Sequence, residues 1–439
     1  MKFKSLVVPC ALLLSFAQPH STEAQTQTIS DFDRQRAQLM LKTVNDEVRK
    51  HYYDTKFHGV DLDKEFAEAK QRIEKVNTMN MALANIANFL DSLDDSHTFF
   101  LPPPHPIKLD YGWQYQMIGE HCFVTQVRAG SDAAAKGVKP GDEVLSINGI
   151  APTRETVWKL QYMYTALRPQ PSLRLALQDR SGKQRSVDVA AHIVQTKRVT
   201  NLTDGGEIWN VIREIEAYDH YARTRFVDSG DDLIVVRLAQ FQYTPREVAE
   251  LMGRVRKHKA LILDLRGNPG GATETVEYLA GDLLSKDVKI ADRVGRKEKK
   301  PMMTKGSHDA FTGKLFVLVD SQSASASEVL TRLIQIEKRG VVLGDRSSGS
   351  VMEAREFSQQ VGSDTAIFYG ISITDADLIM SDGKSLEHVG VTPDELILPT
   401  AADLSANLDP VMARAAELAG VHISAADAGK MFPYEWPPE

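Results

Sequence analysis

Between residues 233 and 343, short runs of apolar residues alternate with amphipathic helical patterns, and this order restricts the fold more than any other feature. Apolar runs without polar alternation are typical of strands buried on both faces. Strands separated by helices form parallel or mixed sheets covered by helices. The expected strands are 233–238, 260–265, 314–319 and 340–343; the expected helices are 244–257, 273–284, 326–336 and 405–418. The sequence therefore predicts an α/β domain over 196–439.

Composition and charge limit the class of protein. The chain has 439 residues, enough for two or three domains. Its hydrophobic content of 42% and charged content of 25% are typical of a soluble globular protein. The formal net charge of -7, without a dominant basic run, argues against nucleic acid as a partner.

The first residues are typical of an export signal. Lys2 and Lys4 precede an apolar stretch over 6–16, and a small-residue cleavage site follows, ending at Ala24. The stretch is too short to span a bilayer, and no later stretch is suited to do so. We therefore expect a signal peptide over 1–24 and an exported protein without a transmembrane segment, periplasmic or extracellular. A disordered N-terminus is the alternative.

Little in the sequence supports a metal, a cofactor or a cysteine nucleophile. The chain has no HExxH motif and no cysteine pair, so we expect neither metal nor cofactor. Cys10 would leave with the signal peptide, and Cys122 then remains alone, without an intrachain disulfide. Cys122 lies in an apolar run, which favours a buried structural thiol over a reactive one.

Residues 25–102 are predicted to form an N-terminal helical domain. Apolar residues recur at spacings of three and four over 36–53, and Asp61 is a suitable N-cap for a second helix that runs through Val76. A third helix is expected over 80–93. Three consecutive prolines over 102–104 end regular structure, so a domain boundary is placed there.

Residues 103–195 are predicted to form a small β-rich domain. The expected strands are 123–127, 144–147, 173–177 and 186–189, and the expected helices are 133–135 and 154–167. This order, and above all the stretch GVKPGDEVLSINGI, resembles a PDZ domain. PDZ domains bind extended C-termini by adding a strand to a sheet edge. The resemblance implies that Gly112, Trp113, Gln114 and Tyr115 form the carboxylate-binding loop; a spacer that binds nothing is the alternative.

A glycine-rich turn over 264–271 reads DLRGNPGG and joins an expected strand to an expected helix. Glycines let backbone N–H groups approach a ligand closely, and the helix N-terminus adds partial positive charge. The turn therefore suits an oxyanion or a phosphate, although no Gly-Lys-Ser/Thr follows, which excludes a P-loop. A purely structural turn is the alternative.

A serine-rich turn over 321–328 reads SQSASASE and also joins a strand to a helix. A hydroxyl on such a turn is exposed at the sheet edge and backed by the helix N-terminus, as a nucleophile requires. One serine must also cap the helix, and Ser325 and Glu328 have capping-box spacing. The residues alone leave open which serine has which role.

Together the two turns resemble the C-terminal-processing (tail-specific) peptidase family, which includes the tricorn core and a retinoid-binding-protein-like branch. The resemblance extends to GVTPDE at 390–395 and covers nearly the whole mature chain. It implies an α/β fold with a crotonase/ClpP-like βαβ catalytic core, an N-terminal helical segment and an inserted PDZ domain. It also implies Ser325 as nucleophile, with an oxyanion hole from the N–H of Ala326 and of Gly270 or Gly271.

One position departs from the tail-specific branch, which uses a Ser–Lys dyad. Ser350 stands where the lysine should be, in the turn GDRSSGS. The tricorn-like branch instead has a histidine base preceded by a serine, together with a distant glutamate. Resemblance to that branch assigns the base to His97 and supporting roles to Ser96 and Glu387. A histidine near its ordinary pKa can take and return the serine proton.

Each of these assignments has a plainer alternative. His97 alone would more often be a structural residue, and a glutamate such as Glu387 is more often solvated. The neighbouring His388 is expected to be exposed or structural. The run RKEKK over 296–300 could supply a substitute lysine, although a solvated charged loop fits it better.

The expected function is that of a secreted serine endopeptidase that cleaves near the C-termini of protein or peptide substrates through an acyl-enzyme. The PDZ-like domain would recruit the substrate tail or gate the cleft, and an oligomer is possible. The alternative is a catalytically inactive family member that binds a peptide or another ligand, and the missing lysine keeps this alternative open.

Overall fold

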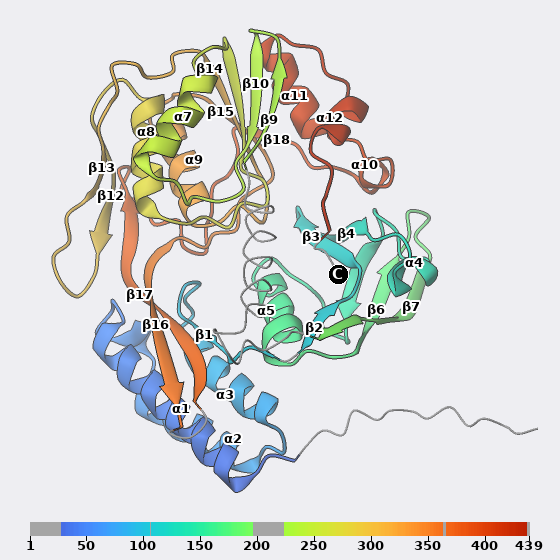
Figure 1. Cartoon of the computed structure of the whole chain (residues 1–439), viewed down its shortest axis with the longest axis vertical. Coiled ribbons are helices and arrows are strands. Elements are labelled where there is room, and N and C mark those ends of the chain that lie inside the picture. The colour runs from blue at the N-terminus through green and yellow to red at the C-terminus, as the bar shows by residue number, and fades with distance from the viewer. Residues whose placement is uncertain (1–27, 106, 196–223, 363–365, 437–439) are drawn as a thin grey trace, which may run out of the picture.

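The computed structural model describes residues 28–105, 107–195, 224–362 and 366–436. The signal peptide predicted over 1–24 lies outside the described residues, as does 196–223, the start of the predicted α/β domain. Figure 1 shows an α/β region at the top, a small β-rich domain at the right and a helical layer at the lower left.

A six-stranded sheet forms the centre of the α/β region, in the order β18-β15-β14-β11-β10-β9. All neighbours pair in parallel except the edge strand β9, which is antiparallel to β10. Every residue of β11 is buried, as the unbroken apolar run predicts. The strands are β9 (Arg225–Ser229), β10 (Leu233–Arg237), β11 (Ala260–Asp264), β14 (Lys314–Val319), β15 (Val341–Gly344) and β18 (Glu395–Leu396).

Helices cover both faces of this sheet (Figure 1). One face packs against α7 (Pro245–Val255), α8 (Thr273–Leu283) and α9 (Ala326–Ile336) in the largest apolar cluster. The other face packs against α11 (Pro410–Ala419) and α12 (Ala425–Met431). The α/β core predicted from the alternating pattern is therefore present.

The prediction of one continuous helix over 405–418 is wrong. The structure has α10 (Ala401–Ser405), a turn, and then α11. Asn407 has a positive φ of 52°, and Asp409 caps α11 with Pro410 at its first turn. Proline lacks the N–H that an interior helical position needs, so it begins a new helix here.

A second sheet extends from the α/β region toward the helical layer. It has the antiparallel order β1-β17-β12-β13, with β16 on β17. Its strands are β1 (Phe99–Leu101), β12 (Val288–Val294), β13 (Met302–Thr304), β16 (Met352–Val361) and β17 (Ile367–Met380). The β16–β17 hairpin reaches down onto the helices in Figure 1.

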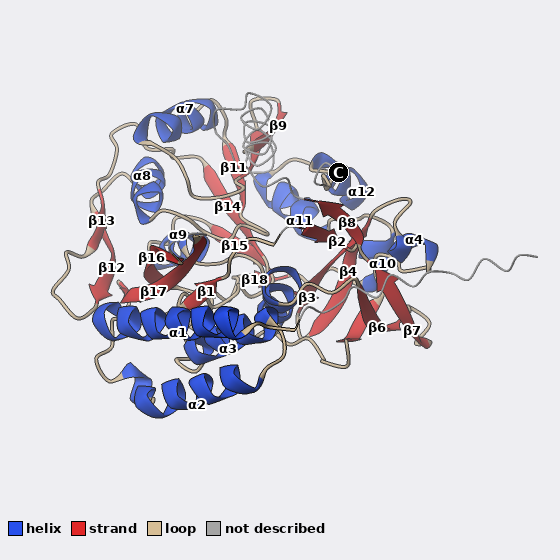
Figure 2. Ribbon diagram, turned by 60° about the horizontal axis from the view of Figure 1, so that its bottom comes forward, coloured by secondary structure: helices blue, strands red, loops and turns tan. Residues whose placement is uncertain are grey.

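The N-terminal helices share a core with that hairpin. Helices α1 (Asp31–His51), α2 (Leu62–Lys75) and α3 (Met79–Asp91) lie in one layer (Figure 2), and a short 3₁₀ turn (Phe57–Gly59) links α1 to α2. Their apolar faces form one buried cluster with Phe100 of β1 and with Ile371 and Ile373 of β17. The helical segment is therefore completed by strands that follow almost 300 residues later.

The β-rich domain has its own core. Its five strands run in the order β3-β4-β5-β6-β7, so β3 is an edge strand. A two-stranded pair, β2 (Ile107–Asp110) with β8 (His192–Gln195), joins its entry and exit. The other elements are β3 (Trp113–Ile118), β4 (His121–Val127), α4 (Asp132–Ala135), β5 (Glu143–Ile147), α5 (Val157–Tyr162), a π turn (Met163–Leu167), β6 (Ser172–Gln178) and β7 (Gln184–Ala190).

The buried thiol of Cys122 is part of that core. Burial raises its pKa to about 12, so the thiol stays protonated and unreactive near neutral pH. This agrees with the structural role predicted for it.

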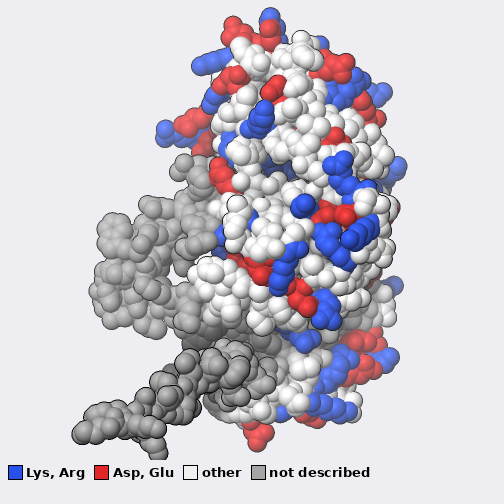
Figure 3. All heavy atoms as spheres, turned by 90° about the vertical axis from the view of Figure 1, so that its right-hand side faces the viewer, with Lys and Arg blue, Asp and Glu red and all other residues white. Residues whose placement is uncertain are grey.

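The surface shows no concentration of one charge on the face in Figure 3, where basic and acidic side chains are interspersed. Among the helices within the described ranges, none combines the length and the apolar character that a bilayer crossing needs.

Phe100→Ala should destabilise the whole protein, because this fully buried ring fills the core shared by the helices and β17. We expect the free energy of unfolding to fall by about 3–5 kcal/mol, measured by urea unfolding. Phe32→Ala, at a ring that is 61% exposed on α1, is the matched control and should change little. Equal unfolding midpoints for the two variants would contradict the shared core.

Candidate active site

Ser325 lies in a strained turn between β14 and α9. Its φ of 57° and ψ of -119° are rare for a residue with a side chain, and such strain is found preferentially at functional sites. Gly270 of the other predicted turn packs directly against it. A Cβ at Gly270 would lie only 2.6 Å from the Cβ of Ser325, so only glycine fits. The fold thus brings the two turns together.

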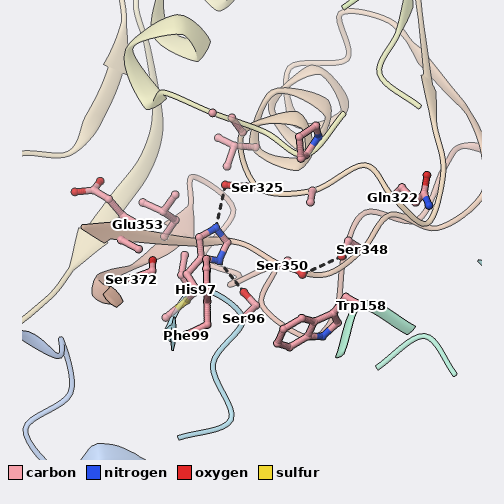
Figure 4. Close-up of a pocket in the computed structure, with 18 of the residues that line it drawn as sticks. Ser96, His97, Phe99, Trp158, Gln322, Ser325, Ser348, Ser350, Glu353 and Ser372 are labelled. Atoms are coloured by element: carbon pink, nitrogen blue, oxygen red, sulfur yellow. Dashed lines mark hydrogen bonds between the residues drawn. The ribbon is translucent and has the colours of Figure 1, made fainter. Parts of the chain in front are cut away.

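His97 approaches Ser325 from the loop that links α3 to β1. Its Nε2 lies 3.2 Å from the Oγ of Ser325, and its Nδ1 lies 2.8 Å from the Oγ of Ser96. Figure 4 shows the imidazole between the two serines. Burial lowers the pKa of His97, so the ring is neutral at pH 7 and able to accept a proton.

Glu387 completes a hydrogen-bonded chain. Its Oε1 accepts from the N–H of Ser96 at 2.8 Å, and its Oε2 accepts from the hydroxyl of Ser96 at 2.9 Å and from the N–H of Val351 at 2.8 Å. Because Ser96 donates to the carboxylate, its oxygen accepts from Nδ1–H of His97. This network assigns the tautomer in which Nε2 of His97 accepts from the Ser325 hydroxyl.

Of the three amides predicted for the oxyanion hole, two are available to a ligand. The N–H of Gly270 donates to the Oδ1 of Asn268 at 2.9 Å, so it is already occupied. The amides of Gly271 and Ala326 make no hydrogen bond with any part of the chain that is described, and both residues line the cleft at Ser325. Ala326 is also the first residue of α9, where the helix dipole favours negative charge.

Glu328 was identified from the sequence only as a capping residue, but it connects two segments of the site. Its carboxylate is fully buried and accepts from the N–H of Ser325, Gly349 and Ser350 and from the hydroxyl of Ser347, at 2.6–3.0 Å. It therefore holds the nucleophile turn against the turn where a family lysine would stand. Burial raises its pKa to about 7, although these four donors favour the ionised form.

Asp95 was missed by the sequence reasoning. Its Oδ1 accepts from the N–H of His97 at 2.8 Å, from the N–H of Thr98 at 3.0 Å and from the hydroxyl of Thr374 on β17 at 2.6 Å. Aspartate side chains often accept a hydrogen bond from the backbone two residues later in a turn, so the sequence DDSH could have indicated this role. Asp95 anchors the His97 loop to the second sheet.

Among the residues that the structure describes, neither a lysine nor a metal cluster accompanies the site. Ser350 accepts the N–H of Ser325 through its carbonyl at 2.8 Å, and the residues that line the cleft include no lysine. Lys299 of the charged run pairs with Glu353 and Asp375 at 2.9 and 2.8 Å. Across the described ranges, no three His, Cys, Asp or Glu side chains are grouped to hold a metal ion.

The cleft around Ser325 has a volume of about 900 Å³. Its apolar part lies among α8, α9 and the second sheet and is formed by Val276, Met302, Val329, Met352 and Leu378. The β-rich domain supplies the opposite wall through β3 and α5, including Trp158, which Figure 4 shows at the rim. The edge strand β3 and α5 therefore border the cleft.

The structure places three of the four residues predicted as a carboxylate-binding loop in the edge strand β3. Trp113 begins β3 and is buried in the domain core, where its ring stacks on Tyr115 at 4.8 Å. The N–H of Gly112 donates to the Oδ1 of Asp110 at 2.8 Å, so a carboxylate of the protein already occupies it. Gln114 and Tyr115 line a second cavity instead.

Comparisons with known proteins agree with this architecture. Residues 232–397 match the model of peptidase family S41, and residues 109–163 match that of the PDZ domain. The carboxyl-terminal-processing protease of Synechocystis is 26% identical over 274 residues, which are 61% of this chain and 57% of that protein. The carboxy-terminal processing protease CtpA of Bacillus subtilis is 22% identical over 360 residues, 77% of this chain and 68% of that protein.

The tail-specific protease of Haemophilus influenzae is 22% identical over 271 residues, 59% of this chain and 36% of that protein. The match thus spans less than two thirds of the Synechocystis and Haemophilus proteins. The crystal structure of mature CPAF covers 85% of this chain and 94% of its own, with a TM-score of 0.63 and 14% identity, and so shares the fold.

Glu328→Gln should move the acid limb of the pH profile. We expect activity to require the ionised form of Glu328, whose pKa is about 7, and the neutral form of His97, whose pKa lies below its ordinary value of about 6.5. In the unchanged chain kcat/KM should therefore rise with pH near 7. The variant should keep only the limb of His97, at lower pH, with kcat reduced about ten- to a hundredfold. An unchanged limb in kcat/KM against pH would contradict this role of Glu328.

Proposed function

We propose that this chain, a member of peptidase family S41 that carries a PDZ domain, is an exported serine endopeptidase that cleaves protein or peptide substrates near their C-termini. The single observation that carries the proposal is the continuous hydrogen-bonded chain from Ser325 through His97 and Ser96 to Glu387. It supplies a nucleophile, a neutral base and an anionic support, which are the parts that acyl transfer requires.

In the proposed reaction, the Oγ of Ser325 attacks the peptide carbonyl while Nε2 of His97 takes its proton. The imidazolium keeps its Nδ1–H bond to Ser96, whose own hydroxyl bonds to Glu387, so the positive charge is stabilised by a carboxylate one hydroxyl away. The amides of Gly271 and Ala326 would hold the oxyanion. His97 then protonates the leaving amine, and the acyl-enzyme is hydrolysed when His97 activates a water molecule.

Two further features support the substrate class and the location. The cleft is large, partly apolar and bordered by the edge strand β3, which suits an extended peptide. The printed names of the relatives describe carboxyl-terminal processing. The export signal predicted over 1–24 supports a periplasmic or extracellular location.

A non-catalytic binding role is not favoured. It depended on the absence of the family lysine, and His97 stands within hydrogen-bonding distance of Ser325 without it. A binding site also does not require a buried imidazole that is oriented by Ser96 and Glu387.

Ser325→Ala should abolish cleavage of an unfolded protein substrate and prevent labelling by a fluorophosphonate at that residue. His97→Ala should lower kcat by about 10²–10⁴-fold, because it removes the general base.

Glu387→Gln and Ser96→Ala should give smaller losses of kcat, since both side chains act through His97. His308→Ala is the matched control, because this histidine is exposed and does not line the cleft. Full cleavage by purified Ser325→Ala protein would show that the nucleophile is assigned wrongly.

A further inference from the structure

A second cavity of about 690 Å³ adjoins the active-site cleft. It lies between β3 and β4 of the PDZ domain, the carboxyl ends of β10 and β11, and the C-terminal segment 432–435. Gln116, Gly267 and Gln322 line both this cavity and the cleft, so the two spaces share a wall. In open α/β sheets, ligands bind beyond the carboxyl ends of the strands, which is where this cavity lies.

Three arginines face this cavity. Arg225 and Arg237 are direct partners across the antiparallel pair β9–β10, and Arg266 follows β11. Like charges directly opposite each other on a sheet are unfavourable. After burial, the next cause that lowers the pKa of Arg225 is the charge of Arg237. The carboxylates of Glu435 and Asp264 offset part of this repulsion, and an anion between the two arginines would relieve the rest.

The three guanidinium groups differ in how far they are satisfied. Arg266 is held by Asp264 and Asp409, with two contacts of 2.8–2.9 Å to each. Arg225 donates to the carbonyl of Pro433 at 3.0 Å and lies 3.8 Å from Glu435.

Arg237 has no hydrogen bond or ion pair with any described residue, and its guanidinium carbon lies 5.9 Å from the ring centre of Phe432. Arg237 is half-buried and lines the cavity, so its guanidinium N–H donors are available to a ligand there. The nearby carboxylate of Asp320 already accepts from Gln116 at 2.7 Å and from the N–H groups of Gly267 and Gln322 at 2.9 and 3.0 Å.

We propose that this cavity binds a carboxylate of the substrate peptide, with Arg237 as the principal donor and Arg225 beside it. The inference rests on the proposed peptidase function. The C-terminal segment of the chain illustrates the chemistry, because a peptide carbonyl and a carboxylate already contact Arg225. Carboxylate recognition is thereby assigned to the arginines and away from Gly112, whose amide is occupied by Asp110. The carboxylate is either the peptide's C-terminus or an acidic side chain.

The test measures binding without cleavage, in the full chain carrying Ser325→Ala. Three fluorescein-labelled apolar peptides are compared by anisotropy. The first is a free acid, the second is the C-terminal amide of the same sequence, and the third is that amide with glutamate as its last residue. We expect the free acid to bind about tenfold more tightly than the plain amide, as the loss of a charged hydrogen bond implies. Arg237→Gln should remove this preference. Arg246→Gln, at a side chain that is 87% exposed on α7, should retain it.

The results distinguish a C-terminal carboxylate from an acidic side chain. They also distinguish failure of the cavity proposal from failure of the peptidase proposal. If the glutamate amide binds as tightly as the free acid, the cavity also accepts an acidic side chain. Equal affinity for all three peptides, or a preference retained in Arg237→Gln, overturns the inference. Arg237→Lys, which keeps the charge, should retain part of the preference and tests the site even if Arg237→Gln is unstable. Hydrolysis by the unchanged chain reports the peptidase function independently.

Discussion

Hydrogen bonds from backbone amides to buried or half-buried carboxylates hold the active site together. Glu328 holds the nucleophile turn against the loop that follows β15, Glu387 holds that loop against Ser96, and Asp95 holds the His97 turn against β17. Each carboxylate bridges segments that are distant in sequence, and each accepts several donors at once. A carboxylate has about four acceptor sites, so one side chain can accept from donors in several segments. The 3.2 Å contact between His97 and Ser325 is therefore a result of this scaffold and not of either turn alone.

The sheet of the α/β region could be predicted because its strands are buried on both faces and read as unbroken apolar runs. The β16–β17 hairpin could not. The residues of β16 are largely half-buried or exposed, so the sequence shows no core-facing run. Its partners in the helical layer lie about 300 residues away, and only the folded chain shows that Ile371 and Ile373 complete that core. The helix expected over 405–418 ran across Pro410, where the structure begins α11.

Parts of the site whose residues are close in sequence could be predicted, and parts whose residues are far apart could not be predicted from the residues alone. Ser325 and Glu328 lie one turn apart, and their capping-box spacing is visible in the sequence. His97 lies 228 residues from Ser325 and was connected to it only through a family resemblance. The oxyanion amides and the pairing of Arg225 with Arg237 depend on hydrogen-bond partners and strand register, which composition and spacing do not encode.

The burial of Glu328 also couples catalysis to the proton balance of folding. Because its folded pKa of about 7 exceeds the value of an exposed glutamate, the native state binds this proton more tightly than the unfolded chain does. The stabilisation from this proton is complete in acid and is lost as the pH rises through about 7. The ionised form that orders the nucleophile turn is thus the less stable one. A pH above 7, which favours turnover by ionising Glu328, therefore also lowers the free energy of unfolding.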